Sequence, residues 1–399
     1  MKIERGNEMK KIWKRMDYSL LLPLIILCVL GVIMVYSASS IVAIMKNKPA
    51  NFFFNKQLFI LAIGGIVFVF ISIIPYRLWR KRIIVVLMGL GSIGLLAAAY
   101  VFGKEVNGAR GWILGIQPAE FVKIFVIILL ARFFAKKQET DTPVFQGSAL
   151  TLFVVGLIMF IILKQNDLGT DILIVGMVGS MFLCSGVRIN IWIKRLALTS
   201  IVWIPALYFI GNHMLSEYQK ARFAVFLDPF ADPQGDGFQL INSYVAIASG
   251  GLHGKGLSNS IQKYGYLPEP QTDFIMAIIS EELGFIGVAI VLISLLLIII
   301  RAFRIAQKCK DPFGSLIAIG LASLIGVQTF VNVGGMSGVI PLTGVPLPFV
   351  SYGGSSLTAN LIAMGILCNI SSHVKQQEKQ RSEVESEREK REPHLVVVK

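Results

Sequence analysis

Apolar runs of about twenty residues recur along almost the whole chain, and no other feature constrains its fold as strongly. A helix of that length crosses the hydrocarbon core of a bilayer, because each residue adds about 1.5 Å to the helix. Only 16% of the residues are charged, and the mean hydropathy is +0.68. Water-soluble domains do not have this composition. The sequence therefore predicts an all-α polytopic membrane protein.

The apolar runs predict about ten transmembrane helices. A polar turn at residues 37–40 follows the first run and further spans come at once, so we interpret this run as a retained helix and not as a cleaved signal peptide. The predicted spans cover residues 18–40, 52–74, 83–102, 119–135, 147–163, 170–186, 190–210, 274–300, 314–333 and 349–370.

Basic residues orient these helices, because cytoplasmic loops of membrane proteins carry an excess of Lys and Arg. All the basic clusters fall on one side, which we assign to the cytoplasm together with both termini. The loops at 103–118, 211–273 and 332–348 then face outward. The clusters are Lys10, Lys11, Lys14 and Arg15; Arg77, Arg80, Lys81 and Arg82; Lys136 and Lys137; Arg188, Lys194 and Arg195; and Arg301, Arg304, Lys308 and Lys310.

In this topology the chain divides into three parts. Residues 1–17 form a cytoplasmic segment, residues 18–370 form the transmembrane domain, and a large extracellular loop of about 211–273 separates helices 7 and 8. Residues 371–399 alternate basic residues with Glu and predict a solvated or disordered cytoplasmic tail. The net charge of +14 reflects topology anchors without interleaved aromatic residues, so we expect no nucleic-acid partner. The four cysteines form no paired motif, and neither disulfides nor a zinc site are expected.

Four residues stand out in and beside the outward loop at 103–118. Arg110 beside Trp112 is consistent with an interfacial aromatic belt and a snorkelling arginine, or with a guanidinium that binds phosphate. Glu120 suits the first turn of a helix. Lys123 lies just inside the apolar run, where a cation must pair with Glu120 or meet an anion. Both alternatives remain open for Lys123.

Two further constellations lie between predicted spans. Asp167 belongs to a polar connection at 164–171, which two consecutive helices need in any case. Repeated Pro and Gly at 334–356 break the helix at membrane depth, and a bilayer tolerates such a break only where the backbone is buried in protein or lines a cavity. This segment therefore predicts a re-entrant or cavity-lining loop.

Candidate functional residues lie near the end of the long loop and just after it. Glycines around Lys255 let the backbone turn sharply, and their N–H groups can hold an anion. Asp273 stands where the chain re-enters the membrane, and Glu281 and Glu282 follow within the next apolar run. Because an isolated carboxylate in lipid is neutral or paired, we expect these two glutamates to face the bundle interior.

The order of several motifs resembles the SEDS family of bacterial cell-wall glycosyltransferases from Asp17 to about Cys368. The runs at 261–270 and 334–344 resemble division-type members more than elongation-type members. Three positions depart from the usual pattern, namely Gly111, Asn166 and Met276, and Gly111 weakens a paired-arginine clamp. The motifs are R-x-x-x-F-L-D-P at 222–229, S-G-G-L-x-G-K-G at 249–256, L-P-E-P-Q-T-D-F-I at 267–275, E-E-L-G at 281–284, P-L-T-G-V-P-L-P-F at 341–349 and S-Y-G-G-S-S at 351–356.

The resemblance implies a polymerase that joins lipid II units into glycan strands at the outer face of the bacterial plasma membrane, for septal synthesis. Asp273 matches the essential aspartate of the family. It can take the proton of the acceptor hydroxyl, or hold a divalent cation, Mg²⁺ or Mn²⁺, on the pyrophosphate. No organic cofactor is expected. The resemblance also places substrate or pyrophosphate contacts at Arg110, Trp112, Glu120, Lys123, Asp167, Lys255 and Glu282.

The implied partners are a class B penicillin-binding transpeptidase, divisome proteins, lipid II and membrane lipids. Three alternatives remain: an elongation-type polymerase, a lipid II flippase built from broken helices and buried charges, and a scaffold that only docks the transpeptidase. A transporter predicts paired interrupted helices in two related halves, and the sequence has no clear internal repeat of that kind. The polymerase is therefore favoured.

Overall fold

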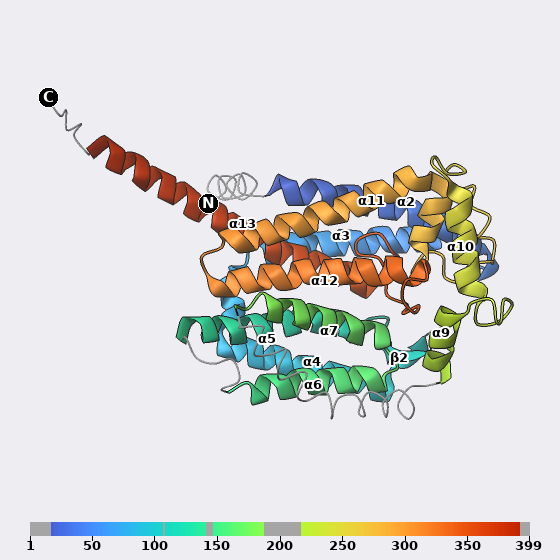
Figure 1. Cartoon of the computed structure of the whole chain (residues 1–399), viewed down its shortest axis with the longest axis horizontal. Helices are drawn as coiled ribbons and strands as arrows, with labels where there is room; N and C mark the ends of the chain where they lie inside the picture. The colour runs from blue at the N-terminus through green and yellow to red at the C-terminus, as the bar shows by residue number, and fades with distance from the viewer. Residues whose placement is uncertain (1–16, 107, 141–146, 187–216, 392–399) are drawn as a thin grey trace.

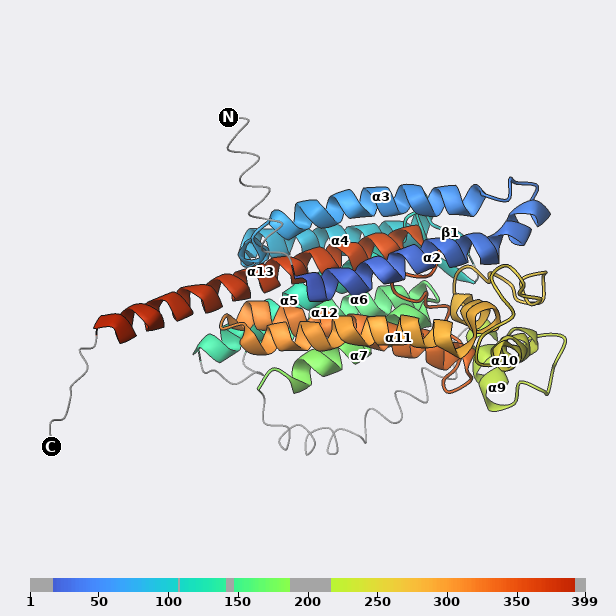
Figure 2. The ribbon, with the colours of Figure 1, turned by 90° about the horizontal axis from the view of Figure 1, so that it is seen from above.

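The computed structural model describes residues 17–106, 108–140, 147–186 and 217–391. Long helices run side by side and form an elongated bundle (Figures 1 and 2). They are α2 (Tyr18–Met45), α3 (Phe52–Ile73), α4 (Arg82–Phe102), α5 (Pro118–Thr140), α6 (Ala149–Lys164), α7 (Leu168–Leu183), α11 (Ile275–Lys308), α12 (Pro312–Met336) and α13 (Gly354–Arg391).

These helices confirm the all-α fold, and they coincide with nine of the ten residue ranges predicted as spans. The tenth predicted span, 190–210, lies outside the described residues, so the number of ten remains a prediction. Six helices of the described chain are long and apolar enough to cross a membrane, whereas α6 and α7 are shorter apolar helices. Large apolar side chains on the outside, such as Leu22, Ile66 and Leu150, are 64%, 71% and 74% exposed. Such exposure suits contact with lipid.

The bundle core lies around α12, which packs against α11, α7 and α5, while α13 packs against α3. Small and apolar residues let these helices approach closely. Ile127 of α5 and Leu321 of α12 are fully buried. Three aspartates begin helices by accepting a backbone N–H at the N-cap: Asp17 for α2, Asp167 for α7 and Asp311 for α12.

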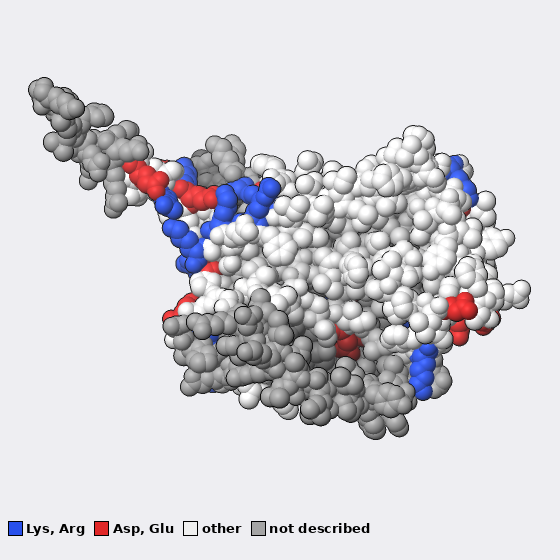
Figure 3. Space-filling view, viewed as in Figure 1, with Lys and Arg blue, Asp and Glu red and all other residues white. Residues whose placement is uncertain are grey.

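The two ends of the bundle carry different residues and elements. At the end where α13 leaves the bundle, Lys and Arg side chains gather, and the middle of the visible face carries almost none (Figure 3). The short 3₁₀ helix η1 (Tyr76–Arg80) contributes two of these basic residues. The opposite end holds the hairpin of β1 (Lys104–Val106) and β2 (Ala109–Trp112), and the helices α9 (Glu217–Leu227) and α10 (Phe238–Gly250). The basic clusters in the described chain thus lie together, as predicted.

One prediction about local structure was wrong. Residues 37–40 form no turn, because α2 continues to Met45 and the hydroxyl of Ser40 donates to the carbonyl of Ser37 inside the helix. The described part of the predicted tail continues α13, which runs to Arg391, and its residues 378–386 are exposed. The described part of the long loop contains two helices, α9 and α10.

Candidate active site

A cavity of about 400 Å³ opens at the end of the bundle that carries the hairpin, α9 and α10. The segment between α12 and α13 forms one of its walls, as the Pro and Gly pattern predicted. The other walls come from α3, β2 and α9, from the segment before α5, from the connection between α6 and α7, and from the loop before α11. The polar and aromatic residues that line the cavity are Lys56, Trp112, Gln117, Asn166, Asp167, Arg222, Glu269, Thr272, Asp273, Thr343, Tyr352 and Ser356.

Hydrogen bonds to the neighbouring backbone hold Asp273 in place. The side-chain amide of Asn332, on α12, donates to the carbonyl of Asp273 at 2.9 Å and to the carbonyl of Val345 at 2.8 Å. The hydroxyl of Ser351 donates to the carbonyl of Thr272 at 2.7 Å. The loop before α11 and the loop before α13 are thereby fastened to each other, and the position of Asp273 is set by both.

The carboxylate of Asp273 faces the cavity next to Arg222. A Cβ atom added at Gly344 would lie 3.4 Å from Asp273 Oδ2 and 3.6 Å from Arg222 Nη1, so both side chains reach this glycine. The φ of Gly344 is +75°, a conformation that favours glycine. The guanidinium of Arg222 also donates to the carbonyl of Leu342 at 3.0 Å. These distances are ordinary contacts, so the backbone conformation and not the space favours glycine at position 344.

Burial raises the pKa of Asp273 from its ordinary value of 3.8 to about 6. The positive charge of Arg222 lowers this pKa, whereas the negative charges of Glu269 and Asp167 raise it. A carboxylate with a pKa near 6 is ionised at neutral pH and still basic enough to accept a proton. The environment of Asp273 thus suits a general base.

Asp167 lines the cavity and also begins α7. Its carboxylate accepts hydrogen bonds from the backbone N–H of Thr170 at 3.0 Å, from the Thr170 hydroxyl at 2.8 Å and from the Gln117 amide at 3.0 Å. Burial raises the pKa of Asp167, and the hydrogen bonds from Thr170 oppose this shift. Asp167 therefore has two roles: it caps α7, and it forms part of the cavity wall.

Glu120 and Lys123 form a buried ion pair on α5. Lys123 Nζ lies 2.9 Å from Glu120 Oε2, and the two side chains are only 1% and 5% exposed. The ion pair with Glu120 thus explains why the charged Lys123 is tolerated inside this apolar helix. The pair does not line the cavity, but its charges act on Asp167 from behind the wall.

Arg110 and Trp112 lie on the same strand of the hairpin but differ in their position relative to the cavity. Trp112 lines the cavity, whereas Arg110 is exposed and does not. The backbone N–H of Arg110 donates to the carbonyl of Gln165 at 2.8 Å, which fastens the hairpin to the end of α6. Of these two predicted site residues, the strand therefore brings only Trp112 to the cavity.

Lys255 and Glu282 lie apart from the cavity, at a break in α11. At Gly284 the backbone leaves the helical conformation, with φ of 65° and ψ of −161°. The backbone N–H of Lys255 donates to the carbonyl of Glu281 and that of Gly256 to the carbonyl of Glu282, both at 2.9 Å. These bonds satisfy carbonyls that the break frees, as membrane proteins require.

The same bonds replace the anion site predicted for the glycine loop. Two of its N–H groups serve the ends of the broken helix, and the N–H of Gly254 donates to the carbonyl of Gly250 at 2.8 Å. A Cβ atom at Gly284 would lie 2.4 Å from the nitrogen of Gly254. Glycines here permit the loop to dock into the break of α11, and the N–H groups that do so are not available to an anion.

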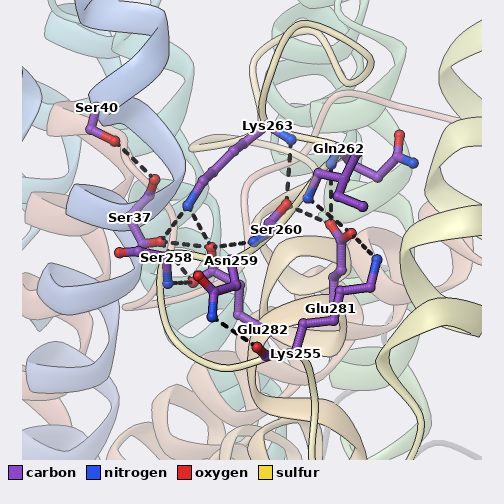
Figure 4. Close-up of polar contacts among 11 residues, drawn as sticks. Ser37, Ser40, Lys255, Ser258, Asn259, Ser260, Gln262, Lys263, Glu281 and Glu282 are labelled. Carbon is purple, nitrogen blue, oxygen red and sulfur yellow. Dashed lines mark hydrogen bonds and ion pairs between the residues drawn. The ribbon is translucent and has the colours of Figure 1, made fainter.

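Glu281 and Glu282 face the bundle interior and are paired, as predicted. Lys255 Nζ lies 2.7 Å from Glu281 Oε1, and Lys263 Nζ lies 2.8 Å from Glu282 Oε1. The hydroxyl of Ser37, on α2, also contacts both oxygens of Glu282, at 2.7 and 2.6 Å. Figure 4 shows how backbone and side-chain groups of residues 255–263 converge on the two glutamates. We call these residues, Ser37, Lys255, Ser258, Ser260, Lys263, Glu281 and Glu282, the paired-glutamate cluster.

Sequence reasoning missed several residues of both sites. Arg222 was noticed only as part of a motif, and Lys56 and Glu269 were not considered for the cavity. Lys263 has only 2% of its side chain exposed, although its sequence neighbours are polar. Asn332 was assigned to a loop and lies in α12. A signal existed only for Arg222 and Glu269, which stand in the quoted motifs near Asp273.

A divalent cation fits this cavity only together with a phosphate ligand. Three carboxylates line the wall, at Asp167, Glu269 and Asp273. However, no group of three or more Asp, Glu, His or Cys residues in the described chain is arranged to hold a metal. Mg²⁺ often binds one or two carboxylates and completes its shell with water and substrate phosphates. Asp273 can supply one such carboxylate.

A bundle of membrane-length helices with a polar cavity at one end defines an integral membrane protein whose site lies near the membrane surface. Comparison with known proteins narrows this class. The family model described as "cell cycle protein", of the FtsW, RodA and SpoVE type, matches residues 18–376. The chain belongs to this family, and the predicted SEDS membership is confirmed.

Relatives and solved structures resemble the chain over most of its length. It is 45% identical to the probable peptidoglycan glycosyltransferase FtsW of Bacillus subtilis strain 168, with 94% of each chain covered. It is 40% identical to the stage V sporulation protein E of the same bacterium, over 90% of this chain and 97% of that protein.

Two solved structures share the fold. A chain from a peptidoglycan synthase complex is 27% identical, with a TM-score of 0.69, over 90% of this chain and 99% of that chain. The crystal structure of the rod shape determining protein RodA of Thermus thermophilus is 25% identical, with a TM-score of 0.62, over 89% and 96%.

Proposed function

We propose that this protein is a peptidoglycan glycosyltransferase that joins lipid II units into glycan strands at the membrane surface. One observation carries the proposal: a carboxylate of raised pKa, Asp273, faces a polar cavity beside Arg222 at the end of a membrane bundle. The relatives named peptidoglycan glycosyltransferase FtsW support the same chemistry, because the similarity covers nearly their whole length.

Asp273 is proposed as the general base. The hydroxyl oxygen of the acceptor sugar attacks the anomeric carbon of the donor, and its proton passes to the carboxylate of Asp273. The bond from the anomeric carbon to the pyrophosphate oxygen breaks, and the electron pair leaves with undecaprenyl pyrophosphate. The raised pKa favours this transfer near neutral pH, since the carboxylate is both ionised and basic.

Arg222 and Lys56 are proposed to bind the pyrophosphate. Both line the cavity, whereas Arg110 is exposed outside it and Lys123 is paired behind its wall. A cation next to the leaving group stabilises the charge that develops as the bond breaks. The predicted phosphate contacts at Arg110 and Lys123 are therefore reassigned here to two other cations, while Trp112 and Asp167 keep their proposed place in the site.

A divalent cation is the alternative role for Asp273. Mg²⁺ or Mn²⁺ bound between this carboxylate and the pyrophosphate would neutralise leaving-group charge. Activity measured with EDTA, and then with Mg²⁺ or Mn²⁺ restored, separates the alternatives. If Asp273 acts as the base alone, EDTA leaves the rate unchanged.

We also propose the direction of the chain in the membrane and its cellular role. The basic end faces the cytoplasm by the positive-inside rule, so the cavity faces outward, where glycan strands are made. The division role is supported by the relatives named FtsW, which are more similar than RodA of Thermus thermophilus. A class B penicillin-binding transpeptidase is the proposed partner, in line with the solved peptidoglycan synthase complex. Location at the septum and contact with divisome proteins follow from the same role.

The test is polymerisation of lipid II by the purified protein with its transpeptidase partner, read as glycan strands on a gel. We expect Asp273→Ala and Asp273→Asn to abolish the strands while membrane insertion is unchanged. Asp236→Asn is the matched control, because Asp236 is exposed in the same loop and does not line the cavity. Full polymerisation by either Asp273 variant would overturn the proposal.

One observation keeps a transporter as the second candidate. The break of α11 at Gly284 is the kind of interrupted helix that transporters place at their binding sites. Vesicles with fluorescent lipid II distinguish the two functions. Transbilayer movement without strands, with the partner present, would favour the transporter, and strands without movement favour the polymerase.

A further inference from the structure

The loop between α10 and α11 pairs its lysines with buried glutamates and exposes several apolar side chains. Lys263, for example, has only 2% of its side chain exposed and lies 2.8 Å from Glu282. Leu252, Leu257 and Ile261 are 58%, 53% and 53% exposed. A single exposed apolar residue is ordinary at a protein surface, but three in one short loop that pairs its charges call for an explanation. Nothing in the proposed polymerase chemistry uses them.

Helix length places this loop at the edge of the hydrocarbon core of a membrane. At the basic end of the bundle, Arg301 Nη2 of α11 lies 2.7 Å from Asp17 Oδ2 at the start of α2. At the other end of the same two helices, the hydroxyl of Ser37 lies 2.7 Å from Glu282 Oε1. About twenty residues of each helix separate the two contacts, which corresponds to about 30 Å, the thickness of the hydrocarbon core. The paired-glutamate cluster therefore lies at the boundary between hydrocarbon and headgroups.

The exposed side chains of the loop continue the apolar outer face of α11. Phe285 and Ile286, the first residues after the break in this helix, are 63% and 46% exposed. The backbone N–H of Phe285 donates to the carbonyl of Gly251 at 2.9 Å, and that of Ile286 donates to the carbonyl of Leu252 at 3.3 Å. Leu252 therefore lies at the depth where the lipid-facing part of α11 begins.

The paired-glutamate cluster holds Leu257 and Ile261 at the same depth. The backbone N–H of Ile261 donates to Glu281 Oε1 at 3.0 Å. The backbone N–H of Ser258, the residue after Leu257, donates to Glu282 Oε2 at 3.0 Å. The glutamates thus fix the backbone of the loop against α11, and the apolar side chains of the loop are left on the outside.

Two exposed tyrosines lie beside this boundary. Tyr36 precedes Ser37 on α2 and is 44% exposed. Tyr264 is 57% exposed, and its backbone N–H donates to the carbonyl of Ile261 at 3.1 Å. Tyrosine is enriched where a membrane meets water, because its ring is apolar and its hydroxyl is polar. The aromatic residues therefore agree with the depth that the helix lengths give.

We propose that the loop at 252–261 enters the headgroup layer of the bilayer, with Leu252, Leu257 and Ile261 in contact with lipid. Lipid is the occupant because the loop continues the face of α11 that meets the hydrocarbon core. Contact with lipid at this depth anchors the first segment of α11, and with it Asp273, at a fixed height relative to the membrane. The same contact forms whichever reaction the cavity performs.

Spin labels measure the depth of the loop in vesicles of phosphatidylcholine and phosphatidylglycerol. The full-length protein, with its native cysteines changed to alanine, receives Leu252→Cys, Leu257→Cys or Ile261→Cys, and each cysteine carries a nitroxide. Collisions of the nitroxide with oxygen, which concentrates in hydrocarbon, and with a water-soluble nickel chelate report the depth.

Two control positions calibrate this depth. Ile293→Cys is the control for hydrocarbon, because Ile293 is 56% exposed on α11. Asp236→Cys is the control for water, because Asp236 is exposed in the outward loop. We expect nickel access at the three loop positions to be about threefold to tenfold below that of the water control, because a polar reagent is excluded from the apolar layer. Oxygen access should lie between the two controls.

Bilayer thickness distinguishes contact with lipid from contact with protein. Lipids with shorter chains lower the headgroup layer relative to the helices, so nickel access at Leu257→Cys should rise, while access at Ile293→Cys stays low. Nickel access equal to that of Asp236→Cys would show a loop in water and overturn the proposal. Low access to both reagents without any dependence on chain length would show a second protein copy over the loop and also overturn it. If one cysteine variant misfolds, Tyr264→Cys reports on the same layer.

Discussion

Two groups of carboxylates flank the first segment of α11 and have opposite environments. Glu281 and Glu282 stand at its end, and the paired-glutamate cluster gives them lysines, a serine of α2 and several backbone N–H groups. Asp273 stands at its start, and in the described part of the chain its carboxylate receives no hydrogen bond and has only Arg222 as a cationic neighbour. One segment of helix thus connects two glutamates whose oxygens all have hydrogen-bond partners to an aspartate whose oxygens face the cavity.

This difference in hydrogen bonding distinguishes carboxylates with a structural role, which we call structural acids, from carboxylates that are suited to catalysis. A carboxylate whose oxygens are all occupied holds elements together. The partners of Glu281 and Glu282 lie in the loop at 255–263 and, through Ser37, on α2. A carboxylate that is buried but not occupied has a shifted pKa and free oxygens, which are what proton transfer needs. In the structure the motif E-E-L-G serves the architecture, and the aspartate before the helix has the environment that the proposed chemistry needs.

Asp273→Asn gives the largest expected effect on activity. The amide is isosteric but cannot accept the proton, so we expect polymerisation to fall about 10²- to 10⁴-fold. The melting temperature should not fall, because no hydrogen bond to the carboxylate is lost. Strand synthesis and thermal unfolding in the same preparation measure both. A variant that loses both activity and stability together would place Asp273 among the structural acids.

Glu282→Gln gives the opposite pattern. Lys263 is buried and would keep its charge without a partner, which costs about 3–5 kcal/mol of folding stability. Thermal unfolding in detergent measures the loss, with Glu378→Gln as the control, because the pair of Glu378 and Lys308 is exposed. The double change of Lys263→Met and Glu282→Leu should recover most of the stability. If Glu282→Gln left the unfolding temperature unchanged, the pair of Lys263 and Glu282 would not be what holds the loop at 255–263 to α11.

Asn332→Ala should affect the rate more than substrate binding. The amide of Asn332 fastens the backbone of Asp273 to the loop at Val345, and without it the carboxylate is less well placed. We expect kcat to fall about tenfold, since small misplacements of a catalytic group are costly, while KM stays within about twofold. Ser337→Ala is the control, because that hydroxyl bonds only within its own helix. An increase in KM with unchanged kcat would argue against a positioning role.

The pH profile should shift in opposite directions for two neighbours of Asp273. Activity is expected to rise as the pH passes through about 6, the pKa of Asp273. Glu269→Gln removes a negative charge that raises this pKa, so the midpoint should move down. Arg222→Gln removes a positive charge that lowers it, so the midpoint should move up, even though the rate also falls. Shifts in the same direction would exclude Asp273 as the titrating group.

The same pKa predicts how stability depends on pH. The folded state holds the proton of Asp273 up to about pH 6, whereas the ordinary pKa is 3.8. Between these values the folded protein binds more protons at this site than the unfolded protein, so the contribution of Asp273 to stability falls as the pH rises. Asp273→Asn should remove that part of the pH dependence. Unfolding curves at pH 4, 5, 6 and 7 test it.

Lys46→Gln gives the smallest expected effect. Lys46 pairs with Glu269 at 3.3 Å, but the side chains are 51% and 36% exposed. Exposed pairs contribute about 0–1 kcal/mol, so the change in stability should be below about 1 kcal/mol, and activity should be nearly unchanged. A large loss of activity would extend the catalytic site beyond the cavity wall to this surface pair.

The fold was largely predictable and the site was predictable in part. Apolar length alone located the long helices of the bundle, because the bilayer requires spans of a fixed minimum length. Asp273 was found because an acid at a membrane boundary needs an explanation. Lys56 was not found, since a lysine near the start of a span resembles any anchor. Lys263 was not found either, because its partner Glu282 lies beyond a loop and a turn of the chain.

The sequence by itself determined the membrane class, the helices, the family motifs and the expectation that Glu281 and Glu282 would be paired inside the bundle. These properties depend on composition, length and local chemistry, which are written along the chain. Only the tertiary structure decided that Arg222 faces Asp273, that Arg110 and Lys123 do not line the cavity, and that Lys255 and Glu282 serve the break in α11. Those outcomes depend on which side of a helix or strand meets a distant segment, and long-range packing fixes this while residue order does not.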